Sequence, residues 1–345
     1  MKKFQLSLIS KYRDELFGLS IIAIIFFHFS CDFLPGVDKG LIDTTGFGWF
    51  VRFCYYFKKY IGSIGVELFL FLSGMGLYYS YSRNPDILNF YRKRFTRILI
   101  PYAIVGLPFW MIKRMYLGGL GFDRVIKDFF FVTFFTDGVH TLWFIGLICV
   151  LYLLYPLFHR LLADSKYSFI WFILLLVLSY MIPQHLYVAA RPFYRNTQIA
   201  ITRFCIFIIG CYMGKFIKKG SSIPYIGVIV LFAVSFYINF YACVHDFPSR
   251  YNRYTDVIFA LGLLPVGCAF LDLFRESNIL MRFLRFVGSY SLELYLTHVT
   301  LRNLMKPLGF HAYDPVQFGI MLLLSMVLSY FIHKIKLNKK PAVTV

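Results

Sequence analysis

Charged residues are scarce in this sequence: Asp, Glu, Lys and Arg make up only 15% of its 345 residues, whereas 59% are hydrophobic. A soluble domain of this length needs far more charge to cover its surface, so the composition excludes an ordinary soluble protein. Long polar segments are also lacking, which leaves no room for a separate soluble domain. We therefore expect one integral membrane domain over residues 1–345.

Acidic residues are the rarer part of that charge, because 17 Asp and Glu stand against 36 Lys and Arg, for a net charge of +19. An excess of this size occurs in nucleic-acid-binding proteins. Here, however, the basic residues lie between apolar stretches and not along one amphipathic face. We therefore expect no nucleic-acid partner. The basic residues instead indicate membrane topology and contact with the headgroups of a lipid bilayer.

Two kinds of catalytic motif are missing. The seven Cys are scattered, and none forms the pair of pairs that a metal site needs, so we expect neither a metal nor a disulfide framework. Ser73 stands in Leu-Ser-Gly without the Gly-x-Ser-x-Gly elbow of a nucleophilic serine. A small residue that allows close helix packing is the better interpretation of Ser73.

Apolar runs of about 18–22 residues, in contrast, recur along the whole chain, and this is the length that crosses about 30 Å of hydrocarbon. Aromatic residues, 21% of the total, suit the belts at membrane interfaces. The expected fold is therefore all-α, a polytopic membrane bundle of about ten transmembrane helices. The predicted spans are 16–34, 61–82, 95–117, 141–161, 167–187, 198–217, 223–244, 256–274, 286–306 and 316–336.

The basic residues predict the orientation of these spans. With the N-terminus inside, 21 of the 36 Lys and Arg, including Lys339 and Lys340, fall in the mostly short cytoplasmic segments. This bias places both termini in the cytoplasm. The outer segment 122–135 mixes charge with aromatic residues and is a candidate for a short interfacial helix.

Ionisable residues inside a span are costly, so function is the default hypothesis for them, and three stand out: His28, Glu67 and His298. At about 1.5 Å per residue, both histidines lie about 16–18 Å beyond the cytoplasmic start of their spans. Glu67 enters from the outer side. One intramembrane His alone is as well explained by a hydrogen bond between helices. Two at matched depth with a carboxylate nearby favour proton transfer, with the carboxylate fixing the imidazole tautomer.

A second cluster stands at the cytoplasmic start of the third span, where Arg92, Lys93, Arg94 and Arg97 precede Pro101. Arg94 and Arg97 are three residues apart and share a helical face. Two guanidinium groups there suit a polyphosphate. A topology signal with lipid contacts explains the same residues equally well.

Taken together, these residues resemble the bacterial membrane acyltransferase-3 family, which includes the O-acetyltransferases of surface polysaccharides. The similarity covers most of the chain and follows the family's order. It rests on the first-helix run that ends on His28, the acidic residue before Leu-Ser-Gly, the Arg-rich run that ends on Pro101, the late helix that ends on His298, and a fifth segment from His140.

The resemblance implies transfer of an acyl group, usually acetyl from cytoplasmic acetyl-CoA, to a hydroxyl of an exported carbohydrate at a bacterial inner membrane. It implies that His28 is the catalytic base or a transient acyl carrier, supported by Glu67 and His298. It also implies that the CoA phosphates bind the basic cluster, Arg92, Arg94 and Arg97.

One position departs from the family. The family usually has a basic residue eleven positions before the first-helix His, and here that position is Phe17. Arg13 lies one helical turn earlier and is the candidate substitute. Glu67 stands where Asp is common.

Two other functions fit the same composition. One is a proton-coupled transporter or flippase of a lipid-linked saccharide, in which His and Glu carry protons. The other is an assembly subunit without chemistry. The transporter leaves the Arg-rich mouth without a role, and the subunit leaves the buried ionisable groups unexplained.

Overall fold

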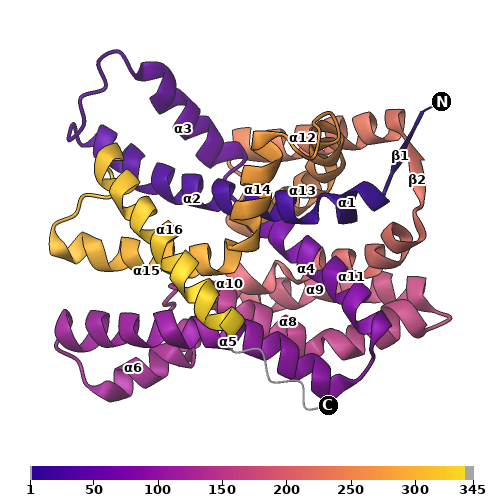
Figure 1. Ribbon diagram of the computed structural model, residues 1–345, viewed down its shortest axis with the longest axis horizontal. Helices are drawn as coiled ribbons and strands as arrows, with labels where there is room; N and C mark the ends of the chain where they lie inside the picture. The colour runs from indigo at the N-terminus through magenta and orange to yellow at the C-terminus, as the bar shows by residue number, and fades with distance from the viewer. Residues whose placement is uncertain (1, 339–345) are drawn as a thin grey trace.

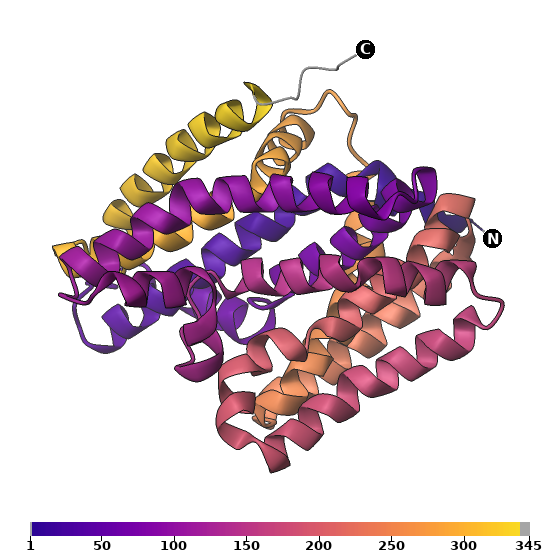
Figure 2. The same ribbon diagram turned by 90° about the horizontal axis from the view of Figure 1, so that it is seen from below.

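The computed structural model describes residues 2–338, and it is a bundle of helices with one short pair of strands (Figures 1 and 2). In chain order the elements are β1 (Lys3–Gln5), α1 (Ser7–Lys11), α2 (Arg13–Asp38), α3 (Gly48–Tyr60), α4 (Ile64–Arg83), α5 (Ile87–Met111), η1 (Ile112–Tyr116), α6 (Phe122–Phe129), α7 (Val132–Thr136), α8 (Trp143–His159), η2 (Arg160–Asp164), α9 (Ser168–Ala189), α10 (Arg191–Ile201), α11 (Phe204–Lys219), β2 (Ser222–Pro224), α12 (Tyr225–Val244), α13 (Ser249–Leu271), α14 (Ile279–Ser289), α15 (Ser291–Met305), η3 (Lys306–Leu308) and α16 (Pro315–Asn338).

The all-α polytopic bundle is confirmed. Within residues 2–338, eight helical stretches are long and apolar enough to cross a membrane, or nine if the bent pair of α3 and α4 forms one span. The predicted spans other than 286–306 each overlap one of these stretches. The predicted interfacial segment 122–135 holds the two short helices α6 and α7.

The predicted span 286–306 is not one helix. The chain ends α14 at Ser289 and begins α15 at Ser291, with Tyr290 between them outside helical geometry (φ −102°, ψ 8°). α15 has 15 residues, about 22 Å at 1.5 Å per residue, which is short of the hydrocarbon thickness. Hydropathy averages over such a break, and this is why the sequence predicted a continuous span.

Glycines bring two pairs of helices into backbone contact. A Cβ on Gly74 of α4 would meet the carbonyl oxygen of Phe207 in α11, and a Cβ on Gly210 of α11 would meet that of Phe71 in α4. Without a hydrophobic drive between helices in lipid, such small residues permit the close van der Waals packing that holds them together. α2 and α14 pack in the same reciprocal way.

The described chain begins and ends at one end of the bundle. β1 pairs antiparallel with β2, so that Lys3 lies opposite Pro224 in the loop after α11. Arg13 at the start of α2 and His333 near the end of α16 line one cavity. This arrangement matches the expected topology, in which both ends share a side. The predicted cytoplasmic residues Lys339 and Lys340 lie outside the described residues.

The long apolar helices leave much of their surface uncovered, as a lipid-facing bundle requires. In α9 only 11% of the most apolar stretch is buried, although its mean hydropathy is 1.8. Side chains such as Ile170, Met181 and Val188 are more than half exposed. Contact with hydrocarbon makes this exposure favourable.

Candidate functional site

The two intramembrane histidines meet. His28 of α2 and His298 of α15 lie with Nδ1 of the first 2.9 Å from Nε2 of the second. His298 is 1% exposed, whereas His28 is half-buried and keeps one accessible side. The expectation that these residues share one level of the bundle agrees with this contact.

The hydrogen bonds determine which nitrogen is free. His298 Nδ1 lies 2.6 Å from the carbonyl oxygen of Leu294, and a carbonyl only accepts, so this nitrogen carries the proton. In the neutral ring the Nε2 of His298 is then an acceptor, and His28 donates to it from Nδ1. His28 Nε2 therefore keeps its lone pair. A residue in this state can take a proton from a hydroxyl.

A cluster of charges lies one helical turn beyond the histidines on the same two helices. Arg302 donates two hydrogen bonds to Asp32, from Nε to Oδ2 at 2.5 Å and from Nη2 to Oδ1 at 2.7 Å. Lys306 donates a third bond to Asp32 Oδ1 at 2.6 Å. This paired, largely buried group fixes α15 against α2 directly beside the imidazoles.

Glu67 has a different partner from the one expected. Its Oε1 accepts from Nε of Arg203 at 2.8 Å, with side chains 0% and 3% exposed. The Arg203 guanidinium also lies 5.2 Å from the centre of the Trp143 ring. The acceptor that fixes the tautomer of the histidine pair is thus the carbonyl of Leu294, and the carboxylate of Glu67 instead neutralises a buried cation. A buried pair of this kind is costly to break from either side.

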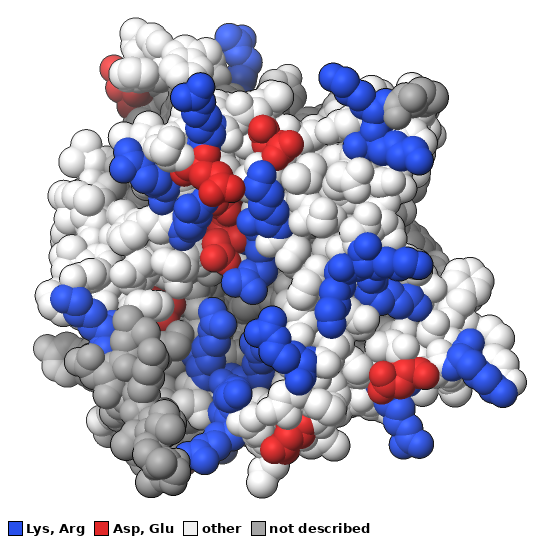
Figure 3. Space-filling model, turned by 45° about the vertical axis from the view of Figure 1, so that its right-hand side comes forward, with Lys and Arg blue, Asp and Glu red and all other residues white. Residues whose placement is uncertain are grey.

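At the end of the bundle that holds the N-terminus, basic side chains surround a hollow (Figure 3). This arginine cavity, of about 560 Å³, is lined at its mouth by Arg13, Arg83, Arg94 and Arg97. Arg94 donates a hydrogen bond to Ser80 of α4 and is partly buried, whereas Arg97 is exposed. Asp14 also lines the cavity and pairs with Arg13, Nη2 to Oδ1 at 2.8 Å. Four guanidinium groups against one carboxylate leave the lining positively charged, which suits a polyanion.

The predicted basic residues do not all face this cavity. Arg92 is exposed, and the lining includes Arg94 and Arg97 without it, as expected for a residue on another face of α5. Phe17 lines the cavity at the position where the family has a basic residue. Arg13, one turn earlier on α2, lines it too, so the candidate substitute is in the right place.

Aromatic rings connect the arginine cavity to the histidines. Phe69 and Phe144 line its inner part, with ring centres 6.0 Å apart. Phe144 packs against Tyr295 at 5.4 Å, and Tyr295 lies 6.1 Å from His298. The inner wall of the cavity is therefore one ring away from the histidine pair.

Three charged residues beside the site were not singled out from the sequence: Asp32, Arg203 and Arg302. Each falls inside a predicted span, so the signal that identified Glu67 applied equally to them. Asp32 and Arg302 each follow one of the histidines by four residues, which is the spacing of neighbours on a helix face. Within the described part of the chain, no group of three His, Cys, Asp or Glu residues is placed to hold a metal ion.

Comparison with known proteins agrees with this geometry. The family model described as an acyltransferase domain matches residues 18–334, which is most of the chain. No curated protein and no solved structure matches the chain. With its histidine pair, its arginine cavity and this match over nearly the whole length, the chain belongs to the membrane acyltransferase-3 family.

Proposed function

We propose that this acyltransferase moves an acetyl group from acetyl-CoA to a hydroxyl of a carbohydrate, with His28 as the proton acceptor. The observation that carries the proposal is the arginine cavity, whose inner wall reaches the histidine pair through Phe144 and Tyr295. Transporter chemistry gives such a polyanion site no role.

The donor fits the cavity by charge and by shape. Acetyl-CoA carries phosphates at one end and its thioester at the end of a long flexible arm. Arg94 and Arg97, with Arg13 and Arg83 beside them, match the phosphates, and the apolar inner wall matches the arm. In this arrangement the thioester carbonyl lies on the histidine side of the cavity.

The reaction then needs one proton acceptor. His28 Nε2 takes the proton of the acceptor hydroxyl while that oxygen attacks the thioester carbonyl. The C–S bond breaks, and the thiolate of CoA receives the proton back from His28. His298 keeps its own Nδ1 proton, which it donates to the carbonyl oxygen of Leu294, and it holds the His28 ring by accepting the hydrogen bond from His28 Nδ1.

The deciding experiment compares acetyl esters on surface polysaccharide in cells that carry wild type or His28→Ala at matched membrane levels. We expect the rate of ester formation to fall by about 10²–10⁴-fold, the usual contribution of a positioned proton acceptor. His245→Ala is the control, because that exposed ring bonds only to the carbonyl of Tyr241 in its own helix. An unchanged ester would remove His28 from the mechanism. Loss of polysaccharide export itself would favour the flippase.

A further inference from the structure

The second large cavity lies at the other end of the bundle from the arginine cavity. α9 starts at Ser168, which accepts a hydrogen bond from Lys215 near the end of α11, and it runs away from that end to Ala189. The cavity, of about 610 Å³, opens where α9 gives way to α10 and where α13 begins. We refer to it as the distal cavity. Its volume is that of a site for a small organic ligand.

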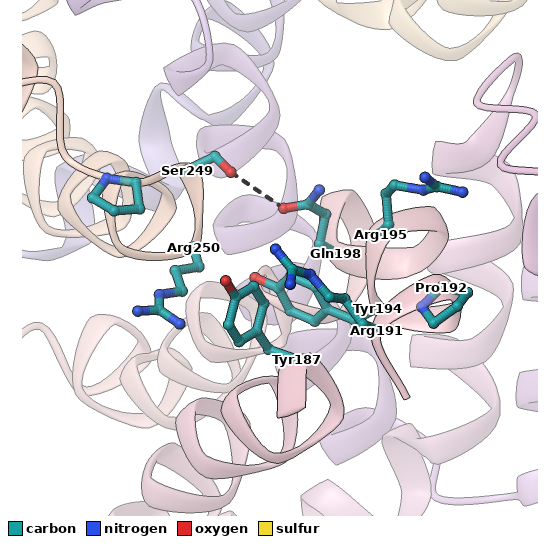
Figure 4. A pocket seen from close by; sticks show the side chains of 9 residues that line it. Tyr187, Arg191, Pro192, Tyr194, Arg195, Gln198, Ser249 and Arg250 are labelled. Atoms are coloured by element: carbon teal, nitrogen blue, oxygen red, sulfur yellow. Dashed lines mark hydrogen bonds between the residues drawn. The ribbon is translucent and has the colours of Figure 1, made fainter. Parts of the chain in front are cut away.

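The distal cavity is rich in arginine and tyrosine. Arg191, Arg195 and Arg250 line it together with Tyr187 and Tyr194, and within the described residues no Asp or Glu does. Figure 4 shows the Tyr187 and Tyr194 rings close together, with Arg191 beside them, Arg250 to one side and Arg195 extending away from the rings. Three cations without a lining carboxylate make the cavity attractive to an anion.

The same cavity offers groups that suit sugar hydroxyls. Gln198 and Ser249 face each other across it at 3.4 Å, and each keeps further hydrogen-bonding capacity. Tyr187 is partly exposed and adds a ring with a polar end, whose centre lies 4.4 Å from the Arg250 guanidinium and 5.2 Å from that of Arg191, while Tyr194 is buried beside it. A site for a bare phosphate would need neither feature.

One buried polar group at this cavity has no protein partner. The hydroxyl of Tyr194 is buried and makes no hydrogen bond within residues 2–338, although the residue is only 3% exposed. Nε of Arg253, one turn of α13 beyond Arg250, is unpartnered in the same way. Buried polar atoms are normally satisfied. Of these two residues Tyr194 lines the cavity and Arg253 does not, so the Tyr194 hydroxyl is the one that an occupant could satisfy.

A line of polar residues leads from the distal cavity towards the reaction site. Arg253 interacts electrostatically with Tyr194 on one side and with Glu67 and Arg203 on the other. Arg203 packs on Trp143, the neighbour of the Phe144 that lines the arginine cavity. The distal cavity and the arginine cavity share no lining residue.

We infer that the distal cavity binds the acceptor, and that this acceptor is an acidic saccharide whose carboxylate or phosphate engages Arg191, Arg195 and Arg250. The inference rests on the proposed function for the word acceptor, and it adds the site and the chemical class. The sugar lies against Tyr187 and the arginines, and its hydroxyls reach Gln198 and Ser249.

The test measures binding to the purified full chain in nanodiscs of phosphatidylcholine, which carries no net charge. The probes are tetragalacturonic acid and its fully methyl-esterified form, which have the same sugar chain and differ in charge and in the ester methyl groups. We expect the acid to bind wild type at least about tenfold more tightly than the ester, as the loss of one charge-assisted contact would give. Equal affinity for the two probes would overturn the inference.

Variants place the binding in the cavity. Arg250→Gln and, independently, Arg191→Gln should each weaken binding of the acid about tenfold, and an unchanged thermal transition shows that they fold. Arg52→Gln is the matched control, an exposed arginine of α3 that is not part of the cavity lining. If both cavity variants bind the acid like wild type, the distal cavity is not the site.

Two further arms separate the sources of failure. Phosphatidylglycerol added to the nanodiscs should leave the affinity for the acid unchanged, and abolished binding would assign the cavity to a lipid headgroup instead. Acetyl transfer is measured on both probes with wild type. Acetyl transfer without preference for the acid would contradict the distal site as acceptor site and keep the proposed function. Binding of the acid without any acetyl transfer would keep the distal site and contradict the proposed function.

Discussion

Replacing His298 tests the hydrogen-bond order of the histidine pair. His298→Leu removes the acceptor of the His28 Nδ1 proton, while His298→Gln keeps a side-chain oxygen at a similar reach. An imidazole N–H left without its partner costs about 1–3 kcal/mol, which corresponds to about a 5- to 150-fold loss in the population of correctly oriented His28. We expect kcat to fall by that factor in His298→Leu, with little change in KM for acetyl-CoA.

The measurement is acetyl transfer from labelled acetyl-CoA in proteoliposomes, with the amount of folded protein fixed by size-exclusion chromatography and thermal unfolding. His298→Gln should recover at least part of the rate, because its amide oxygen can accept from His28. A role for His298 in packing alone predicts the opposite order, since Leu suits an apolar core better than Gln. Equal rates for the two variants, or a wild-type rate in His298→Leu, would refute the reasoning.

Three other predictions concern the surroundings of the site. Arg94→Gln should raise KM for acetyl-CoA about tenfold with kcat nearly unchanged, and Arg92→Gln, outside the cavity, should leave KM as it is; equal effects would argue against the cavity as donor site. Glu67→Gln leaves the buried Arg203 guanidinium without a counter-charge and should destabilise the fold by about 3–5 kcal/mol, seen as a lower thermal midpoint in detergent; an unchanged midpoint would contradict the ion pair. The hydrogen bond that Tyr12 donates at 2.5 Å lowers the pKa of the Asp272 carboxyl. The stabilisation from this contact is therefore fully present above the ordinary pKa of Asp and is lost as the pH falls through the lowered pKa of Asp272. Asp272→Asn should therefore make the thermal midpoint depend less on pH in the acid range. Identical curves of thermal midpoint against pH for the variant and wild type would exclude a contribution of Asp272.

The fold was largely predictable because each apolar run meets the same physical requirement: it is long enough to span the hydrocarbon core of a membrane. The break at Tyr290 escaped prediction because a single residue outside helical geometry leaves hydropathy unchanged. α3 escaped as well, since its 13 residues mix apolar and basic side chains and are too short to span.

The site was predictable in part, for a related reason. Counting residues along two helices gave the matched depth of His28 and His298, because a helix has a fixed rise. The rotation of one helix about another does not follow from counting, so the partner of Glu67 was out of reach. Arg203 stands in the turn between α10 and α11, and only the packed bundle brings it to that carboxylate.

The contacts between the first helix and the late helices share one offset. Glu15 with Arg285, His28 with His298, and Asp32 with Arg302 are each 270 residues apart, on both sides of the break at Tyr290. The two segments therefore run parallel and keep a common register over nearly five turns. One residue inserted at Tyr290 would turn α15 by about 100° and separate the histidines and the Asp32 pair together, while the contact of α14 with Glu15 stayed. The geometry of the histidine pair is thus set by the number of residues along two helices. Evolution can therefore vary loop lengths in this enzyme far more freely than the number of residues between Ser289 and His298.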